Sequence, residues 1–361
     1  MKRGLTILAI ASNLLLSGAA YGQDPKARRL FPIVEHGKIG YIDQTGAYGI
    51  KPQFDRVLIG SNPFTDQDLR TLNFSEGFAG VKIGDKWGFI DQSGKVVIEP
   101  QFRAVWYFSE GLAQIWIADR SGYIDTAGKM VIPPKFVGYS PFSEGLASVN
   151  AGSDKKPEWG YIDKTGRFAI QPKFSFGGTF TEGLAWVHSP TVNGFIDSKG
   201  DIAIRLPDGL MSERFSEGLA RVWTTPAGLI GFIDRTGRIV ISPRRWIPGD
   251  FSEGLSNVCF VNGSGLNCGY IDHQGRTVIE PQYALAGPFS EGLAPVCFAL
   301  RPVAKMECGY IDKTTKLVIP MRFRIAHGFR SGLALVGIGD VYPEKWGYIN
   351  KTGEYVWKPT N

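Results

Sequence analysis

The sequence predicts an all-β protein built from a tandem repeat, and three features carry this prediction. A tetrapeptide Gly-(Tyr/Phe)-Ile-(Asp/Asn) occurs nine times, at intervals of 34 to 48 residues. A hexapeptide Phe-Ser-Glu-Gly-(Leu/Phe)-Ala, or a close variant of it, occurs once between consecutive tetrapeptides. The segments around both motifs alternate with the period of β-strands. Recurrence at such intervals is typical of solenoids, propellers and other arrays. We therefore expect nine units of roughly 38 residues over residues 31–361. The tetrapeptides begin at Gly40, Gly88, Gly122, Gly160, Gly194, Gly231, Gly269, Gly309 and Gly347, and the hexapeptides at Phe74, Phe108, Phe142, Phe180, Phe215, Phe251, Phe289 and Phe329.

Each unit is expected to contain three short strands. The first follows the hexapeptide, as over 112–116, where Ala113 and Ile115 lie two residues apart and share one face. The second contains the tetrapeptide. The third runs over 95–98 in the second unit and ends near Pro100, which has no N–H to donate to a neighbouring strand.

An Asp-x-x-Gly turn is expected between the second and third strands. The Asp side chain can accept N–H bonds of the bend, and Gly can adopt the positive φ that the turn needs. The sequence 312–315 ends in Thr instead of Gly, so we expect a strained or differently shaped turn there. Representative turn residues are Asp43, Gly46, Asp91, Gly94, Asp163, Gly166, Asp234 and Gly237.

The first 22 residues have the features of a secretory signal peptide. Lys2 and Arg3 precede a mostly apolar run over 5–16, and Ala20-Tyr21-Gly22 forms a small-x-small cleavage site. The apolar run is shorter than the roughly 20 residues of a membrane-spanning helix. We expect residues 1–22 to be removed, residues 23–30 to form a linker, and the mature chain to be periplasmic or extracellular with no transmembrane segment.

The composition excludes several other classes of protein. The chain is 43% hydrophobic and 20% charged, which excludes a disordered polypeptide. The formal charge of +6 is spread along the sequence, with no run of five like charges. We therefore expect no nucleic-acid partner.

Three of the tetrapeptides are preceded by Trp, within the segments 85–91, 158–163 and 345–350. Together with the turn, a Pro-(Gln/Lys)-Phe sequence and the hexapeptide, this pattern resembles the bacterial WG-repeat proteins over residues 31–361. The resemblance implies a β-rich repeat fold and no general activity. The Trp is replaced in the other six copies, so it is a replaceable packing position. The pattern is more distantly similar to the aromatic-Gly hairpin repeats of cell-wall-binding modules, which implies a glycan as one class of ligand.

The ends of the chain favour an open, solenoid-like array of nine units, with a β-propeller as the alternative. Residues 33–50 and 333–357 each contain a complete unit, whereas propellers usually close by splitting one blade between the termini. Nine closed blades would also exceed the usual four to eight.

The four cysteines lie in two columns of consecutive repeats. Cys259 and Cys297 follow the valine of the first strand, and Cys268 and Cys308 precede the tetrapeptide. Residues opposite one another at that place in a hairpin are close enough for a disulfide, and an exported protein meets an oxidising compartment. We predict the disulfides Cys259–Cys268 and Cys297–Cys308, with four buried thiols as the alternative.

The sequence offers no catalytic site, metal site or cofactor site. The four histidines occupy different positions of different repeats, and no nucleophile elbow, zinc or phosphate-binding motif is present. We therefore expect no enzyme. One Glu recurs in seven of the eight hexapeptides, and we interpret it as an acceptor of N–H bonds in its own bend, with a calcium ladder as the less favoured alternative. These residues are Glu76, Glu110, Glu144, Glu182, Glu217, Glu253 and Glu291.

Binding is the remaining class of function, and three tryptophans are the candidate ligand residues. Trp116 and Trp223 occupy the column of Cys259 and Cys297, and Trp186 lies two residues earlier in its strand. If the Ala/Val face is the core, the three indoles point outward and can stack on sugar rings. The predicted partner is a cell-wall or other extracellular polysaccharide, or alternatively a protein. The longest linker, over 58–72, is a further candidate for a functional loop.

Overall fold

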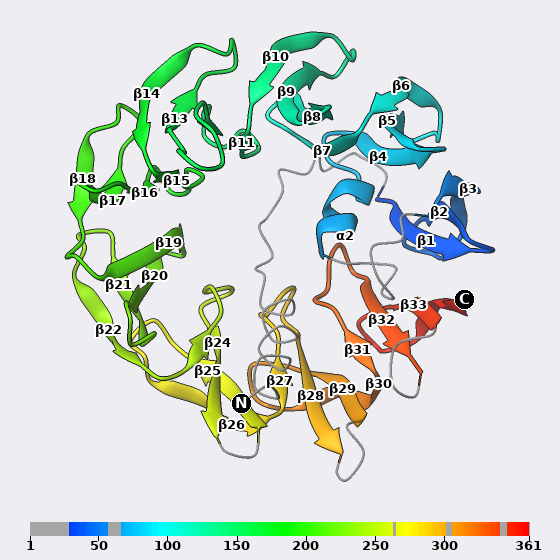
Figure 1. The fold of residues 1–361 in the computed structure, drawn as a ribbon. Helices are drawn as coiled ribbons and strands as arrows, with labels where there is room; N and C mark the ends of the chain where they lie inside the picture. Colours follow the sequence, from blue (N-terminus) through cyan, green and yellow to red (C-terminus); the bar gives the residue numbers. More distant parts are fainter. Residues whose placement is uncertain (1–28, 57–65, 263–264, 301–304, 340–344, 361) are drawn as a thin grey trace.

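The computed structural model describes residues 29–56, 66–262, 265–300, 305–339 and 345–360. The expected signal peptide therefore lies outside the described residues. Eight antiparallel sheets are arranged in a ring (Figure 1), and every sheet is formed by strands consecutive in the sequence. The protein is thus a β-propeller. Within the described residues, no helix is long and apolar enough to cross a membrane.

The first sheet has six strands and contains the first two repeats. It comprises β1 (Phe31–Glu35), β2 (Lys38–Ile42), β3 (Tyr48–Asp55), β4 (Phe78–Ile83), β5 (Lys86–Asp91) and β6 (Val96–Phe102). The two repeats are joined by one strand pair, Asp55 with Lys82. Helix α2 (Asp66–Leu72) precedes β4 and lies on the inner side of the ring (Figure 1), so the second half of the long 58–72 linker forms a helix.

The other seven sheets have four strands each. They are β7 (Ala104–Ser109), β8 (Leu112–Ile117), β9 (Arg120–Asp125) and β10 (Met130–Phe136); β11 (Gly138–Tyr139), β12 (Ala147–Asn150), β13 (Trp159–Ile162) and β14 (Phe168–Phe174); β15 (Phe176–Gly177), β16 (Ala185–His188), β17 (Asn193–Ile196) and β18 (Ile202–Arg205); and β19 (Leu210–Ser216), β20 (Leu219–Thr224), β21 (Ile230–Asp234) and β22 (Ile239–Arg244). The last three are β23 (Ile247–Pro248), β24 (Ser256–Asn262), β25 (Gly265–Ile271) and β26 (Thr277–Tyr283); β27 (Leu285–Ala286), β28 (Ala294–Leu300), β29 (Lys305–Ile311) and β30 (Leu317–Phe323); and β31 (Ile325–Ala326), β32 (Ala334–Ile338), β33 (Lys345–Ile349) and β34 (Tyr355–Thr360).

The expectation of an open array of nine three-stranded units is wrong in two respects. The sheets form a closed ring of eight, because two repeats share the first sheet. Seven sheets also have a fourth, innermost strand, which in five of them is only two residues long. Two residues carry no detectable alternation, so the sequence pattern gave no signal for this strand.

The glycine of the tetrapeptide is required by a close approach of two strands. A Cβ atom on Gly122 would lie 2.4 Å from the carbonyl oxygen of Ile132 on the neighbouring strand. The pairing of β9 with β10 shifts register between Ile132 and Phe136, next to this contact. The bulge therefore brings backbone against backbone, and only glycine fits.

The middle strands of the sheets are buried on both faces, because they pack between two neighbouring sheets. In β8 the consecutive residues Leu112, Ala113, Gln114 and Ile115 are all buried. The sequence-based assumption of one core face and one solvent face therefore does not hold for these strands.

The hexapeptide lies between consecutive strands of one sheet and contacts the next sheet around the ring. Glu144 and Gly145 both have positive φ, of 55° and 82°, and form a tight turn closed by reciprocal N–H···O bonds between Ser143 and Leu146. The Glu144 carboxylate accepts the N–H of Gly183 in the following sheet, at 2.9 Å. The expectation that each Glu bonds within its own bend is wrong, because the carboxylate extends to the equivalent turn one repeat later. The same contact is made by Glu76, Glu110, Glu182, Glu217, Glu253 and Glu291.

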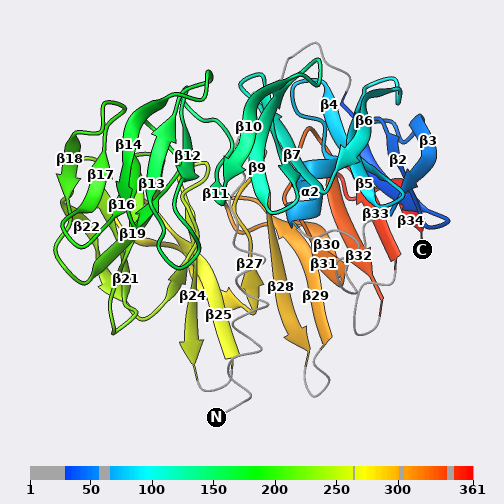
Figure 2. The same ribbon diagram turned by 45° about the horizontal axis from the view of Figure 1, so that its top comes forward.

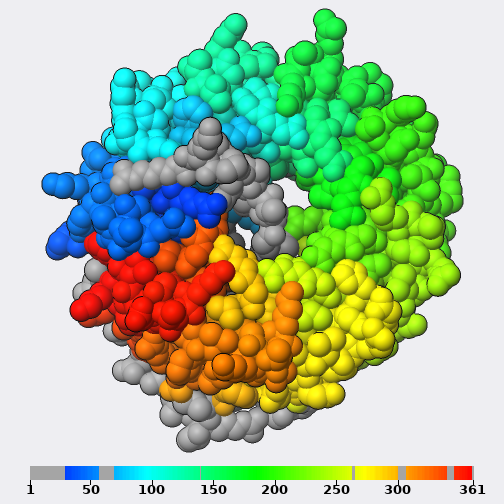
Figure 3. All heavy atoms as spheres, turned by 180° about the vertical axis from the view of Figure 1, so that it is seen from behind, coloured from blue at the N-terminus to red at the C-terminus, as the bar shows by residue number. Residues whose placement is uncertain are grey.

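The ring closes through the same contacts that join its internal sheets. The Tyr161 hydroxyl donates to the carbonyl of Gly178 in the next sheet at 2.8 Å. The Tyr348 hydroxyl of the last sheet donates to the carbonyl of Pro32 in the first sheet at 2.9 Å. Figure 3 shows the first and last repeats, in blue and red, packed side by side. Because side-chain contacts close the ring, no blade needs to be split between the termini. The absence of a split repeat was therefore not evidence for an open array.

Candidate functional site

A cross-strand pair at the base of the hairpin between the two middle strands of each repeat, here called the hairpin pair, contains most of the Trp and Cys residues. In five repeats one member is Trp, contributed by either strand, and the partner is usually small or polar. In two other repeats both members are Cys. The two remaining pairs, Val34–Ile39 and His188–Asn193, contain neither Trp nor Cys. The seven pairs are Lys82–Trp87, Trp116–Ser121, Asn150–Trp159, Trp223–Ile230, Gly337–Trp346, Cys259–Cys268 and Cys297–Cys308.

Both predicted disulfides are present. Cys259–Cys268 and Cys297–Cys308 each join directly opposed residues whose Cα atoms are 4.0 Å apart. The hairpins that they link, β24–β25 and β28–β29, extend on the same side of the ring (Figure 2). The described residues contain no free cysteine.

The three candidate tryptophans do not form an evenly exposed row. Trp186 is buried, with 7% of its surface exposed, whereas Trp116 and Trp223 are half-buried. The rings of Trp186 and Trp223 lie 6.2 Å apart, and Trp116 belongs to a separate sheet. The structure therefore brings two of the three together.

An aromatic cluster surrounds Trp186, and its most exposed member was not a candidate from sequence. The Phe176 ring, on innermost strand β15, is 42% exposed. It lies 5.8 Å from the Trp159 ring and 5.0 Å from the Trp186 ring. His188 stacks on Trp186 at 6.2 Å with an interplanar angle of 22°. Phe176 lies in a two-residue strand, which has no sequence signal of its own. Only its place in space, beside two tryptophans, identifies it as a candidate ligand residue. We call Trp159, Phe176, Trp186, His188 and Trp223 the aromatic cluster.

Hydrogen bonds hold the cluster in position. The Trp186 indole N–H donates to Oδ1 of Asn193 at 3.2 Å. The amide of Asn193 donates to the carbonyls of Pro207 and Leu210, at 3.1 and 2.7 Å. Asn193 directly precedes its tetrapeptide, at the position that holds Trp in three other repeats. An amide that links two sheets therefore replaces an indole here.

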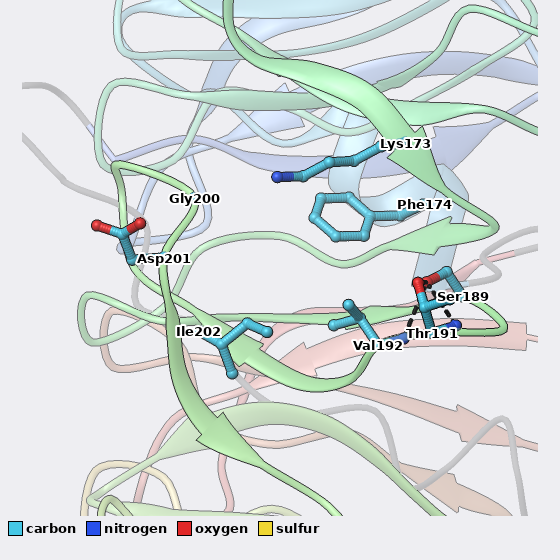
Figure 4. Close-up of a pocket in the computed structure, with 8 residues that line it drawn as sticks. All are labelled: Lys173, Phe174, Ser189, Thr191, Val192, Gly200, Asp201 and Ile202. Atoms are coloured by element: carbon cyan, nitrogen blue, oxygen red, sulfur yellow. Dashed lines mark hydrogen bonds between the residues drawn. The ribbon is translucent and has the colours of Figure 1, made fainter.

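A cavity of about 350 Å³ adjoins the cluster, between β14 and the β17–β18 hairpin (Figure 4). Its walls carry cationic, anionic, hydroxyl and apolar groups. Ser189, which directly follows the cluster residue His188, is buried and accepts the N–H of Val192 at 3.1 Å. The cavity is lined by Lys173, Phe174, Ser189, Thr191, Val192, Gly200, Asp201 and Ile202.

The Asp-x-x-Gly turns lie at the edges of the sheets and have a structural role. Oδ1 of Asp163 accepts the N–H of Thr165 at 2.9 Å and its hydroxyl at 2.7 Å, and Gly166 has φ of 81°. The bond from the Thr165 hydroxyl contributes most to lowering the pKa of the Asp163 carboxyl. Thr315, where Gly was missing, adopts φ of 69° while its N–H still bonds the Asp312 carbonyl at 3.1 Å, so that turn is strained but retains its hydrogen-bonding pattern.

Solved structures with similar folds differ strongly in sequence. One described as "Crystal structure of the eukaryotic initiation factor" has a TM-score of 0.64 at 12% identity and covers 93% of this chain and 97% of its own. A second, described as "KlHsv2 with loop 6CD replaced by a Gly-Ser linker", has a TM-score of 0.40 at 11% identity, with 66% and 88% covered. The first shows the fold alone, and the second is too dissimilar for a comparison of folds.

Sequence comparison identifies the family. No curated protein matches the chain. The model of the family described as "WG containing repeat" matches residues 39–62, 71–87, 87–115, 122–153, 159–187, 230–263, 269–298 and 309–342. These segments make up more than half of the sequence and agree with the repeat read from the tetrapeptides, so the chain belongs to the WG containing repeat family.

Proposed function

We propose that the protein is an exported, non-catalytic module that binds a cell-envelope or other extracellular polysaccharide through the aromatic cluster. The exposed ring of Phe176, packed against two indoles, is the observation that carries this proposal. Flat aromatic faces with nearby N–H donors suit the apolar faces of sugar rings. The repeat β-propeller itself supports a binding or scaffold role.

The two disulfides support the exported location within this proposal. Disulfides persist in oxidising compartments and are rare in the cytosol. The apolar run and cleavage site of residues 1–22 point the same way.

Co-sedimentation of residues 23–361 with insoluble peptidoglycan and a panel of polysaccharides tests the proposal. We expect pelleting that resists 0.5 M salt, because stacking on sugar rings is screened little by ions, whereas attraction of a basic protein to an acidic polymer is screened strongly. Phe176→Ala should abolish pelleting in a folded protein. Phe298→Ala is the matched control, since Phe298 is 38% exposed on a different sheet. Equal pelleting by both variants, or none by the parent protein, would refute the polysaccharide proposal.

A protein-interaction scaffold is the second candidate, favoured by the two disulfide-linked hairpins. Val261 in β24 and Phe298 in β28 are 54% and 38% exposed, and both belong to hairpins on the same side of the ring (Figure 2). Exposed apolar side chains on rigid hairpins are typical of protein-binding surfaces. In this case crosslinking should capture a protein partner that is lost in Phe298→Ala and retained in Phe176→Ala.

A further inference from the structure

The cavity beside β18 lies at a position that carries an aromatic ring in three of the nine repeats, at Tyr48, Phe168 and Tyr355. In the preceding interface the Phe168 ring lies 6.2 Å from the ring of Phe136. Near the ring closure, the Tyr355 ring lies 6.3 Å from that of Phe323. Ile202 occupies the position of Phe168 and Tyr355 in its repeat, opposite Phe174, and is 40% exposed. The cavity therefore occupies space that an aromatic side chain fills elsewhere in the ring.

The charges at the cavity also depart from the repeat. The residue after the turn glycine is basic in six repeats and acidic at Asp201. The Lys173 side chain extends from β14 toward the Gly200–Asp201 turn (Figure 4), with its ammonium 5.3 Å from the centroid of the Phe174 ring. In the part of the chain that the structure describes, neither Lys173 nor Asp201 forms an ion pair. The six basic residues are Lys95, Lys129, Arg167, Arg238, Arg276 and Lys316.

The interface of Arg322 shows how a similar combination of charges is satisfied without a ligand. Arg322 corresponds to Lys173, and Glu354 corresponds to Asp201. The Arg322 guanidinium donates to the carbonyl of Gly353 and lies 5.6 Å from the Tyr355 ring, while Glu354 accepts bonds from Asn350 and Thr352. Among the described residues, Lys173 makes no such contacts across the gap, so both charges remain available to a ligand.

We propose that this cavity binds an aromatic α-amino acid. Its ring would lie against Val192 and Ile202, beside the buried Phe174. Its carboxylate would pair with Lys173 and its ammonium with Asp201, so that each charge on the walls gains a partner of opposite sign. Only 3% of Phe174 is exposed, which leaves no free ring face for stacking on a sugar and distinguishes this site from the aromatic cluster. The family match is interrupted between residues 187 and 230, and that interval contains six of the eight lining residues.

The test measures binding of L-phenylalanine, L-tyrosine and L-tryptophan to residues 23–361 by saturation-transfer NMR and calorimetry. We expect at least one to bind. The matched probes are 3-phenylpropanoate, which lacks the ammonium, and phenethylamine, which lacks the carboxylate. Each should bind at least about tenfold more weakly than the amino acid. Ile202→Phe restores the ring found at Phe168 and should abolish binding. Ile239→Phe is the control, since Ile239 holds the same position one repeat later and is also exposed.

Two results would overturn the proposal. One is the absence of binding by all three amino acids, and the other is binding that survives in Ile202→Phe. Asp201→Lys, which installs the residue type found at equivalent positions, should weaken the binding of phenylalanine more than that of 3-phenylpropanoate. This site is independent of the polysaccharide proposal, so Ile202→Phe should leave pelleting with polysaccharide unchanged.

Discussion

At the scale of single residues, the glutamate of the hexapeptide adopts a backbone conformation that its residue type disfavours. Seven glutamates have φ between 50° and 55°, a region that favours Gly, Asn and Asp. Each carboxylate accepts an N–H of the glycine in the following sheet, as Glu144 does from Gly183. The side chain is therefore explained by a contact outside the turn, which offsets the backbone strain within it.

We predict that variants of Glu144 separate this strain from the contact. Glu144→Gln keeps a weaker acceptor and should be slightly destabilised. Glu144→Gly loses the acceptor but relieves the strain, and Glu144→Ala loses the acceptor while keeping the strain. The alanine variant should therefore cost most, about 1–3 kcal/mol of unfolding free energy, measured by urea denaturation. An alanine variant as stable as the parent protein would show that the bond between sheets contributes nothing.

The turn carboxylates should make stability depend on pH. Because the Thr165 hydroxyl bond lowers the pKa of Asp163 in the folded protein, its contribution is present above the pKa of the unfolded chain, about 4. The contribution is lost as pH falls through the lower, folded pKa. Asp163→Asn should therefore flatten the loss of stability between about pH 5 and pH 2 while keeping the turn, as Asn350 does in the last repeat.

Asp234→Asn is the parallel variant in another repeat, because the Thr236 hydroxyl lowers the pKa of the Asp234 carboxyl in the same way. It should also flatten the loss of stability over the same pH range, measured by thermal unfolding at a series of pH values. Identical pH profiles for Asp163→Asn and the parent protein would contradict the assignment of this dependence to the turn.

At the scale of elements, the hairpin pair shows that one position can be filled in two chemically different ways. A Trp paired with a small residue and a disulfide occupy equivalent places, as in Trp116–Ser121 and Cys297–Cys308. The indole buries a large apolar surface, whereas the disulfide restricts the unfolded chain. Both stabilise the base of a hairpin that connects the two middle strands of a sheet.

This equivalence predicts that a Trp–Ser pair can replace a disulfide in the same hairpin. The double variant Cys297→Ser with Cys308→Ser should lose about 2–3 kcal/mol of unfolding free energy, the usual contribution of a disulfide that closes a short loop. The variant Cys297→Trp with Cys308→Ser recreates the Trp116–Ser121 pair and should recover part of that loss, while leaving only Cys259–Cys268 sensitive to dithiothreitol. If the tryptophan variant is less stable than the serine variant, the two pairs are not interchangeable.

What could be predicted from sequence was the structure determined within one repeat. The three long strands, the turns and both disulfides follow from residues near one another in the chain. The two-residue innermost strands, such as Gly138–Tyr139, are held by pairing with a neighbour and have no local signal. Phe176 was missed for the same reason, since its importance comes from indoles on two different sheets.

At the scale of the whole molecule, two departures from the repeat coincide where the ring closes. No copy of the hexapeptide lies between residue 29 and β1, so the first repeat offers no glycine turn to a carboxylate from the last sheet. The last hexapeptide correspondingly has Arg330 and Ser331 in place of Ser and Glu. Gln44 donates instead to the carbonyl of Ser331, at 2.6 Å, as Lys351 does to that of Glu291 at 3.0 Å. The ring therefore closes through the same kinds of contact that join its internal sheets. For this reason the sequence contains no separate signal for closure.

Closure can be tested by comparing one hydrogen bond at two places in the ring. Tyr348→Phe removes the bond to Pro32 between the last and first sheets, and Tyr161→Phe removes the equivalent bond to Gly178 between internal sheets. Burial raises the pKa of both phenols, so both are donors at neutral pH. Each variant leaves a carbonyl oxygen without its partner, and each should lose about 1 kcal/mol, or up to about 3 kcal/mol where the oxygen stays dry. Equal losses in thermal and urea unfolding follow only if the ring is closed in solution. In an open ring Tyr348 would face water, and Tyr348→Phe would cost nothing while Tyr161→Phe remained destabilising.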